Sequence, residues 1–181
     1  MAAGAAALAT SSRLAAADDP EGSERRPQKA DLLVFSEGER EGTVITPAHF
    51  TRDDPLLKAW PKDPKTGVIR NGSRLNEVLL VKLDPAELDD NTRSRSADGI
   101  VAYSAICSHA GCPITAWMKA ATSDKEVFKC VCHNSEFDPR QNGQVVFGPA
   151  TRRLAALPIS ATDTALTVAA GFVGKLGQQT G

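Results

Sequence analysis

The chain of 181 residues is poor in the residue types that most often carry chemistry or cross a membrane. It has four cysteines, three histidines, one tyrosine and two tryptophans. No stretch approaches the roughly 18 consecutive apolar residues of a membrane-spanning helix. The 21 basic residues nearly balance the 22 acidic ones, and the net charge of −1 gives no support to nucleic-acid binding. With 41% hydrophobic residues, the chain is expected to form one moderate core.

The scarce cysteines and histidines are concentrated in two short stretches. Residues 107–112 (Cys-Ser-His-Ala-Gly-Cys) are called the first box, and residues 130–135 (Cys-Val-Cys-His-Asn-Ser) the second box. Together they hold all four cysteines and two of the three histidines. Each box offers one cysteine and one histidine as a pair, plus a further cysteine. Two thiolates and two imidazoles are therefore available for a metal, and two cysteines remain to form a bridge.

Two simple interpretations of the boxes are structural zinc and a pair of disulfides. Structural zinc modules usually show Cys-x-x-Cys and His-x-x-x-His types of spacing, which differ from the spacing here. Two disulfides without a metal would leave both box histidines unexplained. The third histidine, His49, lies far from both boxes in the sequence and is expected to have a surface or packing role.

The boxes resemble those of Rieske [2Fe-2S] proteins that have a disulfide between the boxes. That family normally shows Cys-Thr-His-Leu-Gly-Cys and Cys-Pro-Cys-His-Gly-Ser, and the differences here remove no ligand. The likeness covers residues 101–149 and includes a Gly148-Pro149 step similar to the family's proline loop. It implies one [2Fe-2S] cluster with four protein ligands, a disulfide between two further cysteines and a serine hydroxyl that reaches the cluster. By this resemblance, the cluster ligands are Cys107, His109, Cys130 and His133. The disulfide joins Cys112 and Cys132, and the serine is Ser135.

This ligand set has a physical consequence for the redox potential. Two ferric irons, two sulfides and two thiolates sum to zero formal charge, whereas four thiolates would leave two negative charges. A neutral cluster accepts an electron more easily, so histidine ligation raises the reduction potential. Each ligating imidazole also keeps a second nitrogen free, through which electron and proton transfer can be coupled.

Phe137 is the departure that bears most on the potential. Hydrogen bonds to the cluster's sulfur atoms stabilise the more negative, reduced state. High-potential members of the family show Ser-x-Tyr-Asp and use the tyrosine hydroxyl, whereas this chain has Ser-Glu-Phe-Asp over residues 135–138. We therefore expect a potential below that of quinol-oxidising relatives.

The number of histidines excludes one of the functions that use such a cluster. A Rieske oxygenase needs a second iron held by two further histidines and a carboxylate, and only His49 is left. The Ser-Glu-Phe-Asp stretch resembles the small subunit of arsenite oxidase and favours an electron-relay subunit of a respiratory redox complex, not a self-contained enzyme. The alternative is the Rieske subunit of a cytochrome bc-type quinol oxidase that takes part directly in quinol oxidation. Expected partners are a cytochrome or a larger oxidoreductase subunit, with quinol as a further candidate.

The compartment follows from the disulfide that the resemblance implies. Disulfides persist outside the reducing cytosol, and proteins of this type are commonly exported folded, so a periplasmic location is expected. Residues 1–30 are interpreted as an export-signal remnant or a disordered tail and linker. Membrane association is expected only through a missing anchor or a partner.

The remaining sequence predicts a mostly β fold over residues 31–175. The resemblance implies an antiparallel base domain and a small cluster-binding subdomain at about 105–150.

Asp84-Pro85-Ala86-Glu87 has the order of a helix start and predicts one short helix through about Thr92. Residues 53–71, which contain three prolines, predict a long surface loop. Arg152 and Arg153 are interpreted first as solvated surface, with docking of an acidic partner as the alternative. Short apolar segments predict strands at 32–35, 44–45, 78–81, 100–103, 127–129, 145–147, 154–159 and 165–169.

Overall fold

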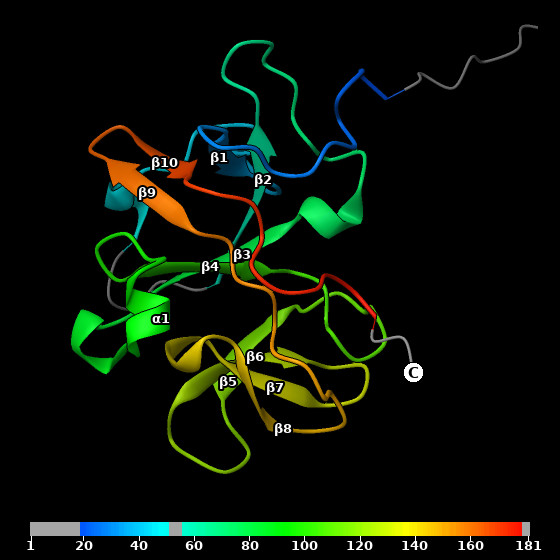
Figure 1. Ribbon diagram of the computed structural model, residues 1–181, viewed down its shortest axis with the longest axis vertical. Helices are drawn as coiled ribbons and strands as arrows, with labels where there is room; N and C mark the ends of the chain where they lie inside the picture. Colours follow the sequence, from blue (N-terminus) through cyan, green and yellow to red (C-terminus); the bar gives the residue numbers. More distant parts are fainter. Residues whose placement is uncertain (1–18, 51–55, 179–181) are drawn as a thin grey trace, which may run out of the picture.

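The computed structural model describes residues 19–50 and 56–178, and its fold is mostly β, as predicted. Two antiparallel sheets are the main elements (Figure 1). The larger sheet contains, in spatial order, β4 (Ile100–Ser104), β3 (Val78–Lys82), β2 (Leu57–Lys62), β1 (Leu32–Phe35), β10 (Ala165–Val168) and β9 (Ile159–Thr162). The smaller sheet contains β5 (Ala116–Lys119), β6 (Glu126–Cys130), β7 (Ser135–Asp138) and β8 (Gln144–Phe147).

Short helical turns connect these strands. The α-helix α1 covers Asp90–Arg93, and four 3₁₀ turns complete the described elements. They are η1 (Pro47–His49), η2 (Arg74–Asn76), η3 (Pro85–Glu87) and η4 (Pro139–Gln141). Among the described residues, no helix is long and apolar enough to cross a membrane.

Strands β3 and β4 of the larger sheet are buried on both faces. One face packs against the smaller sheet, and the other packs in the core of the larger sheet. Side chains alternate between the faces of a strand, so neighbours along β3 enter different cores. Leu79 and Val81 pack with Phe128 and Phe137 of the smaller sheet. Val78 and Leu80 instead pack with residues of β1, β2 and β10. The smaller sheet is thereby fixed to the larger one by a continuous apolar contact.

Tyr103, in β4, adds a ring contact and a hydrogen bond between the two sheets. Its ring packs edge-on against Phe128, and its hydroxyl donates to the Pro139 carbonyl at 2.8 Å. Burial raises the pKa of Tyr103 to about 12, so the hydroxyl stays protonated and able to donate at neutral pH. A buried carbonyl between the sheets is satisfied in this way.

Replacing Tyr103 by Phe should therefore lower the free energy of unfolding by about 1–3 kcal/mol, because the Pro139 carbonyl loses a buried donor. Chemical denaturation monitored by circular dichroism measures this change. Tyr103→Leu should cost more, since it also removes the ring contact with Phe128. A Tyr103→Phe variant as stable as the parent would show that the hydrogen bond contributes nothing.

The prediction of a long loop over residues 53–71 is wrong for its middle part. Residues 57–62 form β2, an interior strand that pairs with β1 from Ala59 to Lys62. Pro61 is compatible with an interior strand because β3 pairs only as far as Ala59. The Pro61 carbonyl accepts from the Arg70 N–H on the side away from β1, so the missing proline N–H interrupts no ladder. The part of the predicted loop at 53–55 lies outside the described residues.

The predicted helix that starts at Asp84 is two separate turns. Asp84 accepts from the Ala86 N–H and begins η3, but Leu88 is extended and buried. Asp89 then caps α1 by accepting from the Thr92 N–H at 2.7 Å. Burial of Leu88 in the inter-sheet core requires the break, because a continuous helix would carry this side chain elsewhere.

The segment before β1 lies against the 70–76 region. The Ser23 carbonyl accepts from the Gly72 N–H, and the Asn76 amide donates to the Arg25 carbonyl at 2.9 Å. Asp31, at the start of β1, forms a buried two-point ion pair with Arg70 that includes a contact of 2.9 Å. Residues 20–31 are thereby attached to the larger sheet.

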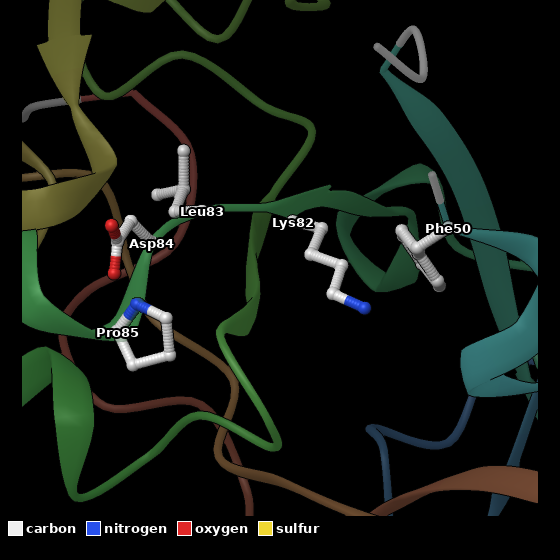
Figure 2. Close-up of a pocket in the computed structure, with 5 residues that line it drawn as sticks. All are labelled: Phe50, Lys82, Leu83, Asp84 and Pro85. Atoms are coloured by element: carbon white, nitrogen blue, oxygen red, sulfur yellow. The ribbon is translucent and has the colours of Figure 1, made fainter. Parts of the chain in front are cut away.

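A pocket of about 620 Å³ opens beside the end of β3. It is lined by Phe50, Lys82, Leu83, Asp84 and Pro85 (Figure 2). Figure 2 shows Lys82 extending toward Phe50, with the Asp84 carboxylate on the other side. These lining residues include no cysteine or histidine, so the pocket adds no group to the metal ligands of the boxes.

Candidate metal centre

The first box is a tight loop between β4 and β5. The Cys107 N–H donates to the Cys112 carbonyl at 2.8 Å, which closes the loop on itself. The Gly111 N–H donates to the Cys107 carbonyl at 3.1 Å, and Gly111 has a φ of 71°, which a residue without Cβ adopts at little cost. The closed loop presents His109 and Ala110 at its tip.

The second box is the turn of the hairpin formed by β6 and β7. Cys130 is the last residue of β6, and it pairs with Ser135, the first residue of β7. Asn134 has a φ of 61°, a left-handed conformation that asparagine tolerates better than most residues. Asn134 can therefore replace the glycine that the family shows at this position without disrupting the turn.

A third loop, residues 148–152, closes over the second box. A Cβ on Gly148 would lie 2.5 Å from the Asn134 carbonyl oxygen and 2.6 Å from the Ser135 Cα, so only glycine fits. The Ala150 N–H donates to the Ser135 hydroxyl oxygen at 3.2 Å. This bond uses the hydroxyl as an acceptor and leaves its O–H to donate to another group.

Burial divides the four predicted ligands into two kinds. Cys107 and Cys130 are each 1% exposed, in the core between the sheets. His109 is half-buried and His133 is exposed. Their rings lie 4.9 Å apart between centroids, at an interplanar angle of 81°. The thiols thus lie on the protein side of the site and the imidazoles on the solvent side.

His109 provides the clearest sign of a missing partner. Its Nδ1 is the one buried side-chain nitrogen or oxygen without a hydrogen bond among the described residues. Such an atom costs free energy unless a partner satisfies it. A buried imidazole nitrogen without a hydrogen bond is suited to binding a metal. The donor set therefore fits a [2Fe-2S] cluster with two thiolate and two imidazole ligands.

Three of the four cysteines form a close group. The Sγ atoms of Cys112, Cys130 and Cys132 all lie within 4.8 Å of one another, and all four thiols are free. Burial raises the pKa of Cys130, so metal binding at this thiol must displace a proton, and the contact with Cys132 raises the pKa of Cys112. The proximity of Cys112 and Cys132 supports the predicted disulfide without showing it. If they pair, Cys130 and Cys107 remain as the thiolate ligands.

Residues outside the predicted ligand set are placed as follows. Phe137 is fully buried beside Phe128 in the inter-sheet core, and its side chain carries no hydroxyl. His49 packs edge-on against Phe35 and its Nδ1 accepts from the Thr46 N–H at 3.0 Å, which confirms the packing role.

Sequence reasoning missed the contacts of two arginines with the first box. The Arg152 side chain donates to backbone carbonyls and is half-buried, which contradicts its interpretation as solvated surface. Arg74 donates to the Gly111 carbonyl at 2.6 Å. Neither contact leaves a local pattern in the sequence, because both join residues that are 37 or more positions apart.

The family model of the Rieske [2Fe-2S] domain matches residues 76–158. These residues contain both boxes and the loop that closes over them. Residues 76–158 form a Rieske [2Fe-2S] domain. A domain of this kind holds one [2Fe-2S] cluster, which the donor set at the boxes fits. The zinc and metal-free alternatives are thereby set aside.

Curated relatives support the same assignment. The chain is 46% identical over 108 residues to the cytochrome bc1 complex Rieske iron-sulfur subunit of Corynebacterium diphtheriae, covering 56% of this chain and 26% of that protein. The Corynebacterium efficiens subunit is 36% identical over 164 residues, covering 84% of this chain and 37% of its own length. The chain therefore spans well under half the length of these two relatives.

Two solved Rieske structures also show some likeness. The soluble domain of the Rieske protein II from Sulfolobus acidocaldarius aligns with a TM-score of 0.39 at 18% identity, covering 51% of this chain and 61% of that one. The cyanobacterial plasma membrane Rieske protein from Synechocystis aligns with a TM-score of 0.38 at 24% identity, covering 61% and 84%.

Proposed function

We propose that the chain is an electron-transfer iron–sulfur subunit that relays electrons through one Rieske [2Fe-2S] cluster within a respiratory redox complex. The observation that carries the proposal is the donor set of two buried thiols and two outward imidazoles, in which the buried His109 Nδ1 has no hydrogen bond among the described residues. Cys107, His109, Cys130 and His133 hold the cluster, which supplies one-electron chemistry.

The protein contributes burial, access and hydrogen bonds to this chemistry. Cys107 and Cys130 keep one side of the site dry, while exposed His133 leaves a route to a partner's redox group. The Ser135 hydroxyl, oriented by the Ala150 N–H, is free to donate toward the cluster. The domain extends over residues 31–175, with the cluster-binding part at about 105–150.

A cytochrome bc1-type complex is the first candidate for the assembly, because the relatives are subunits of that complex. A cytochrome then receives the electron. We place the Cys112–Cys132 disulfide next to the cluster and the domain in the periplasm, attached to the membrane through a partner or an anchor. Direct participation in quinol oxidation is not favoured, since Phe137 lacks the hydroxyl that high-potential members use.

Replacing Phe137 by Tyr should raise the reduction potential, because a hydroxyl donor stabilises the more negative reduced cluster. A hydrogen bond to a charged group contributes about 1.5–3 kcal/mol, which corresponds to a shift of about 60–130 mV for a one-electron couple. Redox titration followed by electron paramagnetic resonance measures the shift. Ser135→Ala removes a donor and should move the potential the other way. An unchanged or lower potential in Phe137→Tyr contradicts the account.

The relay function is tested on the complex purified in mild detergent. We expect a cytochrome to copurify with this chain and to oxidise the reduced cluster in rapid-mixing experiments. In a His133→Gln complex this electron transfer should disappear. Inhibitor-sensitive quinol oxidation that depends on this chain would instead establish the quinol-oxidising role and overturn our preference for relay.

A further inference from the structure

Two arginines from outside the boxes converge on the backbone of the first box. Arg74, in η2, donates from Nη1 to the Gly111 carbonyl at 2.6 Å. Arg152, the last residue of the loop 148–152, places its Nη2 3.5 Å from the Ser108 carbonyl oxygen. Carbonyls on both sides of His109 therefore face a guanidinium group.

The contact between Arg152 and the first box is reciprocal. The Ser108 hydroxyl donates to the Arg152 carbonyl at 2.7 Å, while the Arg152 side chain approaches the Ser108 carbonyl. Ser108 is 1% exposed, and its bond to the Arg152 carbonyl is partly buried. A neutral hydroxyl–carbonyl bond and a longer, charge-assisted guanidinium contact thus join Arg152 to the first box.

Arg152 also attaches the C-terminal segment to the site. Its guanidinium donates to the Lys175 carbonyl at 3.1 Å and to the Gly177 carbonyl at 3.0 Å. Figure 1 shows this segment, in red, running from the larger sheet toward the smaller one. A Cβ on Gly111 would lie 3.4 Å from Arg74 Nη2 and 3.7 Å from Gln178, so box, arginine and segment are in close contact.

Both guanidinium groups keep their positive charge uncompensated. In the parts of the chain that the structure describes, neither arginine has a carboxylate within 4 Å, and each contacts only carbonyl groups. The neighbouring Arg153 differs, since it is exposed and donates to the Gln141 carbonyl at 3.1 Å, away from the first box.

We propose that Arg74 and Arg152 form an arginine clamp, which positions the first box and stabilises the reduced cluster. The inference rests on the cluster assigned above to the two boxes. Reduction adds one negative charge to the cluster, so two fixed positive charges beside its binding loop favour the reduced state and raise the potential. The clamp also joins residues 175–178 to the loop that carries His109, so the C-terminal segment supports the site.

The first test is a redox titration of the cluster in the parent protein and in four variants of the full chain. Arg74→Gln and Arg152→Gln should each shift the potential downward, and the double variant further. Arg153→Gln is the matched control, because it removes the same charge one residue away and should leave the potential unchanged. Equal potentials in all three single variants would overturn the proposal.

A second measurement separates charge from positioning. Hydrogen exchange of residues 173–178 should be about tenfold faster in Arg152→Gln than in Arg153→Gln, because one charge-assisted contact is lost. Arg152→Lys keeps the charge but loses the two-pronged donor, so its potential should stay near that of the parent while exchange accelerates. If Arg152→Lys lowers the potential as much as Arg152→Gln, the electrostatic part is wrong. If Arg152→Gln fails to retain the cluster, Arg152→Lys is compared with the parent protein, and a lowered potential in Arg152→Lys then shows that the electrostatic part is wrong.

These results distinguish the clamp from the function on which it rests. Absence of a Rieske signal in the parent protein would refute the cluster and the relay function together. An intact signal with unshifted potentials and unchanged hydrogen exchange in the Arg74 and Arg152 variants would refute the clamp alone.

Discussion

Replacing His133 by Gln should abolish the electron paramagnetic resonance signal of the reduced Rieske cluster. His133 is one of two outward imidazoles, and its ring lies 4.9 Å from that of His109 between centroids. An amide is a poor substitute for imidazole as an iron ligand, and loss of one ligand exposes the cluster to water. Iron analysis of the purified variant should show the accompanying loss of metal.

The matched control for this experiment is His49→Gln. His49 packs on Phe35 and accepts from the Thr46 N–H, so its loss should leave the signal intact while lowering stability slightly. Circular dichroism should show that His133→Gln retains its sheets, because the core of the larger sheet does not include the boxes. A full Rieske signal in His133→Gln would show that the ligand assignment is wrong.

Replacing Arg70 by Met should lower the free energy of unfolding by about 3–5 kcal/mol, because it leaves the Asp31 carboxylate buried without its cation. The two side chains are 5% and 2% exposed, and two nitrogens of Arg70 contact two oxygens of Asp31. The same guanidinium donates to the Gly22 carbonyl at 3.3 Å, so the segment before β1 should also loosen. Equilibrium denaturation measures the change.

Lys119→Met provides the comparison at an exposed ion pair. Lys119 and Asp124 are 72% and 101% exposed, and such pairs contribute about 0–1 kcal/mol. Both variants remove the cation of an ion pair with aspartate, but the pair at Arg70 is buried and the pair at Lys119 is exposed. An Arg70→Met protein as stable as Lys119→Met would mean that the buried pair contributes no more than a surface one.

The metal centre could be predicted from the sequence because its ligands are local. Cys107 and His109 lie two residues apart on one loop, and Cys130 and His133 lie three apart on another. The residue types at this spacing indicated the cofactor before any fold was known. The structure then added what spacing does not contain, including the unpartnered His109 Nδ1 and the fit of Gly148 against the second box.

The sequence-based predictions were wrong where the local structure depends on residues that are distant in the sequence. Pro61 suggested a loop, yet β3 has already ended where the missing N–H would have been needed. Leu88 lies inside a sequence that begins like a helix, but its burial between the sheets breaks the turn. Arg152 reads as surface in the sequence, because the carbonyls that bind it belong to the first box and the C-terminal segment.

Electron paramagnetic resonance of the dithionite-reduced parent protein tests the central claim most directly. The account predicts the signal of one histidine-ligated [2Fe-2S] cluster per chain. Two irons per chain in the metal analysis should accompany it. A protein that contains zinc, or that is free of metal with its cysteines paired, and gives no such signal would contradict the account.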